Sequence, residues 1–123
     1  MTAKILIVDD DLSILELVRI LLVKEGFEVK TATNGETGLK EITEWRPDVL
    51  VLDIMMPKMS GYMVAAIMEK DENLKKIPII QLTATSQLVG GISLKSPSPY
   101  RIQKPFQPEE LLELINEILS KQN

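Results

Sequence analysis

One stretch constrains the fold more than any other part of this sequence: residues 49–61, which read VLVLDIMMPKMSG. Its first four residues are all apolar, which predicts a short strand buried on both faces of a parallel sheet. Asp53 then lies where that strand reaches the surface, the position at which open α/β sheets bind ligands. Pro57 ends any regular ladder, and Ser60 with Gly61 predicts a helix N-cap and a flexible loop. A single carboxylate here can equally be a cap or turn residue, so its role depends on the other strand ends.

Four further segments are predicted strands, at residues 5–8, 27–32, 79–82 and 100–103. Residues 27–32 alternate apolar and polar side chains, as a strand does when only one face is well buried, so we expect an edge strand. Polar groups follow the other three strands at their carboxyl ends: Asp9, Asp10 and Asp11 after the first, then Thr83 and Lys104 after the last two. Because the carboxyl ends of parallel strands meet at one edge of a sheet, we expect these groups to converge with Asp53.

Helical periodicity separates the strands at about residues 12–25, from Asn34 to Trp45, after Gly61 and from Pro108 onward. The first helix has two candidate caps, a capping box at residues 13–16 and the carboxylate of Asp11. Strands and helices alternate along the chain, and right-handed crossovers then give a parallel sheet covered by helices on both faces. Residues 86–94 could add a short helix, but Gly90-Gly91 weakens it, and the Ser-Pro-Ser-Pro run at 96–99 cannot be helical.

Composition excludes several classes of function. The 123 residues suffice for a single domain, 1–123, with a real core and no room for a second. Since cysteine and histidine are both absent, disulfides, thiolate or imidazole metal ligands and Cys or His catalytic groups are excluded. The formal charge of −4 argues against direct contact with nucleic acid, and no apolar segment is suited to spanning a membrane.

The expected cluster of carboxylates favours a metal site that could support phosphate chemistry. Asp9, Asp10 and Asp53 would repel one another, so a site that keeps them charged needs a cation, and oxygen ligands favour Mg²⁺ or Mn²⁺. Lys104 can neutralise a phosphate, and the Thr83 hydroxyl can donate a hydrogen bond to it. Asp53 would be the nucleophile, because carboxylates form aspartyl-phosphate intermediates. Each residue alone also fits a helix cap, a solvated lysine or a plain strand end, but their joint occurrence at successive strand ends favours a functional site.

With these motifs the sequence resembles the receiver domain of two-component response regulators, from about residue 4 to residue 118. The motifs are ILIVDDD at 5–11, Asp53 followed by Met-Pro at 56–57 and Gly61, LTA at 82–84 and KPF at 104–106. The resemblance implies a flavodoxin-like, doubly wound, five-stranded parallel sheet in the order 2-1-3-4-5. It also implies that Asp53 accepts a phosphoryl group from a sensor histidine kinase or phosphotransfer protein, which alters binding to a downstream protein.

The same resemblance assigns roles to the remaining site residues. Asp10 and Asp53 would coordinate Mg²⁺, with Asp9 acting largely through water and the backbone carbonyl of Met55 completing the shell. Thr83 and Lys104 would bind the phosphoryl group and shift on phosphorylation. The chain would be cytoplasmic and not a conventional enzyme, although Mg²⁺-dependent self-phosphorylation and slow autodephosphorylation are expected. It ends at Asn123 without an output domain, which fits either a single-domain regulator or a piece of a longer protein.

The segment 85–100 departs from the family pattern. Receiver domains usually have a fourth helix there and an aromatic residue three positions before the lysine, where this chain has Arg101, with Tyr100 one place earlier. We therefore predict a short or irregular fourth helix, with local disorder or a nonstandard loop between residues 85 and 99. This leaves open a receiver-like interaction module that works without phosphorylation. A phosphohydrolase of the haloacid dehalogenase type is a third reading, but it needs a second acid where this chain has Met55.

Overall fold

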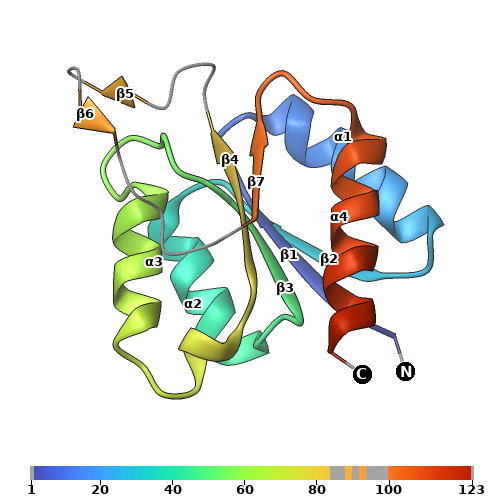
Figure 1. The fold of residues 1–123 in the computed structure, drawn as a ribbon, viewed down its shortest axis with the longest axis horizontal. Helices are drawn as coiled ribbons and strands as arrows, with labels where there is room; N and C mark the ends of the chain where they lie inside the picture. Colours follow the sequence, from blue (N-terminus) through green and yellow to red (C-terminus); the bar gives the residue numbers. More distant parts are fainter. Residues whose placement is uncertain (1, 84–87, 90–91, 94–99, 123) are drawn as a thin grey trace.

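The computed structural model of the protein describes residues 2–83, 88–89, 92–93 and 100–122 (Figure 1). The strands are β1 (Lys4–Val8), β2 (Glu28–Ala32), β3 (Val49–Asp53), β4 (Ile79–Thr83), β5 (Leu88–Val89), β6 (Ile92–Ser93) and β7 (Tyr100–Gln103). The helices are α1 (Leu12–Lys24), α2 (Gly35–Trp45), α3 (Gly61–Glu69) and α4 (Pro108–Lys121), with a 3₁₀ turn η1 (Leu74–Lys76). The boundaries agree with the predicted segments to within a few residues.

A parallel sheet of five strands forms the centre of the molecule, in the order β2-β1-β3-β4-β7. This confirms the predicted order 2-1-3-4-5, with β7 in the fifth place, and the predicted edge position of the alternating strand β2. The order reverses between β1 and β3, which pair with Val8 level with Leu52. A crevice forms beyond the carboxyl ends of strands at such a reversal, so the fold brings the residues after Val8 and Leu52 to a binding position.

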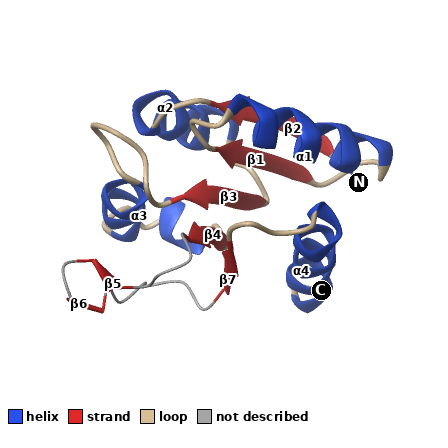
Figure 2. Cartoon of the chain, turned by 90° about the horizontal axis from the view of Figure 1, so that it is seen from above, coloured by secondary structure: helices blue, strands red, loops and turns tan. Residues whose placement is uncertain are grey.

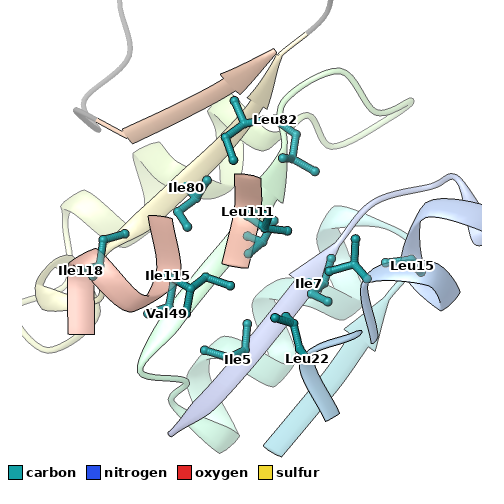
Figure 3. Close-up of a cluster of buried hydrophobic side chains, with 13 residues drawn as sticks. Ile5, Ile7, Leu15, Leu22, Val49, Ile80, Leu82, Leu111, Ile115 and Ile118 are labelled. Atoms are coloured by element: carbon teal, nitrogen blue, oxygen red, sulfur yellow. The ribbon is translucent and has the colours of Figure 1, made fainter. Parts of the chain in front are cut away.

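Helices cover both faces of this sheet, α1 and α4 on one side and α2 and α3 on the other (Figure 2). Alternate side chains of β1 are divided between the two layers. Ile5 and Ile7 pack with Leu22 of α1 and Ile115 of α4 (Figure 3), whereas the intervening Leu6 belongs to the layer under α2 and α3. Because both faces are buried, residues 5–8 of β1 and 49–52 of β3 are continuous apolar runs, which is the pattern that identified these strands.

Helix starts differ from the predictions at two places. Asp11 caps α1, since its Oδ1 accepts from the N–H groups of Ser13 at 2.9 Å and Ile14 at 3.3 Å. The Asp11 prediction is thus confirmed and the capping box at residues 13–16 was wrong, because the helix already begins at Leu12. Ser60 caps α3 as predicted, but Gly61 is the first residue of that helix and is buried rather than part of a flexible loop.

The region after β4 holds a feature that periodicity did not predict. Residues 88–89 and 92–93 form the short antiparallel pair β5–β6, in place of the short helix considered at residues 86–94. The pair lies on the same side of the sheet as α3 (Figures 1 and 2). The rest of the nonstandard loop predicted for residues 85–99 lies outside the described residues. Within the described part of the chain, no helix is long and apolar enough to cross a membrane.

Candidate functional site

Two buried carboxylates and one lysine meet at the carboxyl edge of the sheet. Lys104 Nζ lies 2.8 Å from Asp9 Oδ2 and 3.3 Å from Asp53 Oδ2. The exposed fraction is zero for Asp9 and 3% for Asp53. Charges that far from water need a partner of opposite sign, and Lys104 provides one for both acids at once. The predicted convergence of these three residues is therefore present in the structure.

Each of the two carboxylates is also fixed by a main-chain hydrogen bond. The second oxygen of Asp9 accepts from the N–H of Asp11 at 2.9 Å, and that of Asp53 accepts from the N–H of Met55 at 3.0 Å. In both cases the donor lies two residues further along, where the strand turns into its loop. One oxygen of each acid is thus held by the backbone and the other faces Lys104, which orients both carboxylates toward a common point.

Asp10 completes a cluster that could hold a metal ion. One carboxylate oxygen from each of Asp9, Asp10 and Asp53 lies within 4.8 Å of the others. Asp10 is exposed, unlike the other two, so its carboxylate can move toward an arriving ion. A set made only of oxygen donors suits hard cations such as Mg²⁺ or Mn²⁺. The residues present therefore fit the metal that the sequence predicted.

Thr83 lies at the same edge but its hydroxyl is directed toward β7. The side chain is 5% exposed, and Oγ1 donates to the carbonyl oxygen of Ile102 over a long 3.5 Å. The N–H of Lys104 donates to the Thr83 carbonyl oxygen at 2.7 Å, which joins the ends of β4 and β7. Thr83 and Lys104 are thus coupled through the main chain, although the Thr83 hydroxyl is bonded to a strand carbonyl in this conformation.

The charges at the site shift one another's pKa. Burial raises the pKa of the Asp53 carboxyl from 3.8 to about 6, and the nearby charge of Asp9 acts in the same direction. The Met55 N–H and the Lys104 ammonium oppose this rise. Burial lowers the pKa of Lys104, but its contacts with Asp9 and Asp53 outweigh this effect and the net direction is upward. Further positive charge beside Asp53 would therefore favour its ionised form near neutral pH.

Gly61 contributes to the site in a way that the sequence did not reveal. A β-carbon at this position would overlap the carbonyl oxygen of Asp53 and lie 2.6 Å from the Cα of Ile54. Only glycine lets the first turn of α3 pack directly on the main chain that carries the candidate nucleophile. The one signal available in sequence was a glycine shortly after Pro57, which suggested a loop and not a close approach.

This combination of a reversed parallel sheet and an acidic cluster with a bridging lysine defines a class of signalling domain. The profile of the response regulator receiver domain matches residues 5–116, and the chain belongs to that family. The chemotaxis response regulator CheY4 of Vibrio cholerae has the same fold, with a TM-score of 0.81 and 30% sequence identity over 96% of this chain and 99% of that one.

Curated relatives include longer proteins. The DNA-binding response regulator MtrA of Mycobacterium tuberculosis is 38% identical over 91% of this chain and 48% of its own length. The DNA-binding dual master transcriptional regulator RpaA of Synechocystis is 35% identical over 96% of this chain and 49% of its own length. The chain thus spans about half the length of these relatives. Because both relatives are named as DNA-binding, the expectation of no direct contact with nucleic acid, which was drawn from net charge, is not supported.

Proposed function

We propose that this chain is a phosphoacceptor domain in which Asp53 receives a phosphoryl group from a histidine kinase or a phosphotransfer protein. The observation that carries the proposal is the pairing of buried Asp53 and Asp9 through one lysine, with Asp10 close by. A site built only to stabilise the fold would not keep two buried acids side by side, because apolar residues there are usually more stable. Membership of the receiver family supports the same role.

In the proposed reaction an oxygen of Asp53 attacks the phosphorus of a phosphohistidine. The P–O bond to Asp53 forms as the P–N bond to the donor breaks, and the imidazole leaves with the electron pair of that bond. Lys104 neutralises charge on the transferred group, and Thr83 donates its hydroxyl hydrogen once it leaves the Ile102 carbonyl. Mg²⁺, when bound by Asp9, Asp10, Asp53 and the carbonyl of Met55, would reduce the repulsion between carboxylate and phosphate.

The proposed protein donor must cover the rim of this site, and the rim has an apolar side. A groove of about 390 Å³ lies between α1 and the segment after β7, and Lys104 lines it together with Ile14, Leu17 and Phe106. Large apolar residues are also exposed over the outer surface of α1: Leu12, Leu17, Ile20 and Val23. An apolar groove that continues into a group of exposed apolar side chains often marks a protein interface, so we assign this surface to the donor protein.

Intact-mass measurement after incubation with Mg²⁺ and acetyl phosphate tests the phosphoacceptor role. The wild type should gain one phosphoryl group that is lost in base, because an acyl phosphate hydrolyses readily. Asp53→Asn should gain none. Asp48→Asn is a matched control, since Asp48 lies at the opposite end of β3 and bonds the N–H of Lys4.

The alternatives give different results in the same experiment. A wild type that gains no phosphate under these conditions would favour a receiver-like interaction module that works without phosphorylation. Steady turnover of phosphate monoesters would favour a phosphohydrolase. We expect only slow loss of phosphate from Asp53, because this chain has Met55 where phosphohydrolases of the haloacid dehalogenase type have a second acid.

A further inference from the structure

Methionine is concentrated after the phosphoacceptor in a way that the proposed function does not use. Five of the six methionines fall between residues 55 and 68. The chain has no cysteine, so methionine is its only sulfur-containing residue. Peroxides oxidise the methionine thioether to a sulfoxide, which converts a flexible apolar side chain into a polar one. Any response of this chain to a peroxide through sulfur must therefore come from methionine.

These five methionines differ in exposure, which decides which of them an oxidant can reach. Met55 and Met63 are exposed over 52% and 50% of their surface. Met56 and Met68 are buried, with 7% and 1% exposed, and Met59 packs partly buried against the layer under α2 and α3. Because oxidation follows exposure, Met55 and Met63 should react first and leave the core intact. These two residues are the candidates for a modification that alters the site without unfolding the chain.

Of these two residues, Met55 is the one hydrogen-bonded to the phosphoacceptor. Its N–H donates to Asp53 Oδ1 at 3.0 Å, and its Cα lies within about 4.5 Å of that oxygen, because an N–Cα bond is about 1.5 Å long. The sulfur is only three bonds beyond Cα, so it stays at the rim of the acidic cluster in every rotamer. Met63 lies instead in the first turn of α3, where its N–H donates to the Ser60 cap. Met55 and Met63 thus form a matched pair, equally exposed but differently placed.

We propose that Met55 is a site of reversible oxidation, at which a peroxide converts the thioether to a sulfoxide and so slows phosphorylation of Asp53. The inference rests on the proposed function. A sulfur lone pair attacks one oxygen of hydrogen peroxide, the O–O bond breaks, and the proton of the transferred hydroxyl passes to the departing hydroxide to give water. Sulfur is oxidised by two electrons, and the peroxide is reduced by two.

Two effects of the sulfoxide oppose phosphoryl transfer. The cluster already holds the carboxylates of Asp9, Asp10 and Asp53 beside the ammonium of Lys104. A sulfoxide carries partial negative charge on its oxygen, so at the rim it adds to the repulsion that an anionic donor meets. The sulfoxide is also hydrated, and a donor that covers the rim has to remove this water. Oxidation of Met55 should therefore slow transfer to Asp53 without disturbing the packed core.

Graded treatment with hydrogen peroxide, followed by catalase, tests the inference. Peptide mass mapping should show that Met55 and Met63 gain one oxygen before Met56 and Met68, with an unchanged circular dichroism spectrum. Phosphorylation of Asp53 by acetyl phosphate and Mg²⁺ should then slow by about three- to tenfold relative to the untreated wild type, the effect of about one hydrogen bond on the barrier. Methionine sulfoxide reductases A and B together should restore the rate, because each reduces one sulfoxide epimer.

Met55→Leu and Met63→Leu are the matched variants, since each removes one equally exposed thioether. The ratio of the rates after and before peroxide should be close to one in Met55→Leu, whereas Met63→Leu should slow as the wild type does. A response that persists in Met55→Leu, or a wild-type rate that does not change once Met55 is oxidised, would overturn the inference. An untreated wild type that takes up no phosphate would show that the proposed function itself fails, and the inference would fall with it.

Discussion

The main chain of Gly61 lies directly against the carbonyl group of Asp53. The first residue of helix α3 is therefore in contact with the peptide group that follows Asp53, the proposed phosphoacceptor. The loop of residues 54–60 leaves β3 and returns to it, and Ser60 caps the helix at the return point through the Met63 N–H. A loop closed in this way holds Asp53 at both its side chain and its main chain, which limits how far the carboxylate can drift before it reacts.

Gly61→Ala tests this contact because two effects have opposite signs. Alanine is the better helix former by about 1 kcal/mol, which would stabilise α3. The added β-carbon would overlap the Asp53 carbonyl and the Ile54 Cα, and such overpacking costs about 1–3 kcal/mol. We expect the clash to dominate and urea unfolding to show a net loss. Met63→Ala, at an exposed position of the same helix, should change stability little, and a stabilised Gly61→Ala would show that the contact can relax.

Lys104→Met should separate the counter-ion role of the lysine from its packing. Asp9 and Asp53 would lose their shared positive partner, and we expect a loss of about 2 kcal/mol in EDTA, below the range for fully buried pairs because Lys104 is partly exposed. Added Mg²⁺ should then raise the unfolding temperature more in the variant than in the wild type. Lys121→Met, at an exposed position in α4, is the control. Equal responses to Mg²⁺ in wild type and variant would argue against the bridge.

The raised pKa of Asp53 predicts a pH dependence of stability in EDTA. The carboxyl titrates at about 6 in the folded chain against 3.8 ordinarily, so the folded state holds the proton more strongly. The stability from this group is complete below about pH 3.8 and is lost as pH rises through about 6. The wild type should therefore lose about 2–3 kcal/mol relative to Asp53→Asn between about pH 4 and pH 7.5, as followed by urea unfolding. A difference that does not vary with pH would contradict the assignment.

If the apolar surface of α1 binds the donor protein, a substitution there should slow phosphoryl transfer from a protein donor but not from a small-molecule donor. Leu17→Glu places a charge in the groove beside Lys104, so transfer from a phosphorylated histidine phosphotransfer protein should slow by about tenfold or more. Phosphorylation by acetyl phosphate should continue at the wild-type rate, because that donor needs no protein surface. Ile67→Glu makes the same change at an exposed position of α3, across the sheet, and should leave both reactions unchanged. Equal slowing by both substitutions would exclude α1 as the docking face.

Much of the fold was predictable because a strand that is buried on both faces of the sheet has a continuous run of apolar residues. The runs at residues 5–8 and 49–52 have no polar member, so the strands and the positions of Asp9 and Asp53 after them were evident. The cluster itself followed from strand ends meeting at one edge, and the contacts of Lys104 with both acids agree with it.

The features that escaped prediction depend on contacts between distant segments. Whether Asp11 or the box at residues 13–16 caps α1 depends on how soon the chain turns after β1, which local pattern does not determine. The closeness of Gly61 to Asp53 needs the return path of α3. Gln81 sits inside an otherwise apolar run, and only the packed sheet reveals that its amide is buried without partners among the described residues.

The three aspartates after β1 are chemically identical, but the structure gives each a different neighbour. Asp9 faces Lys104, Asp10 is exposed in the acidic cluster, and Asp11 caps α1 while its own N–H donates to Asp9. Deleting any one of the three aspartates yields the same shortened sequence, in which two carboxylates remain for three structural roles. As the sequence varies, this segment must therefore preserve the number of residues between β1 and α1. The local density of negative charge alone would not keep each aspartate in its place.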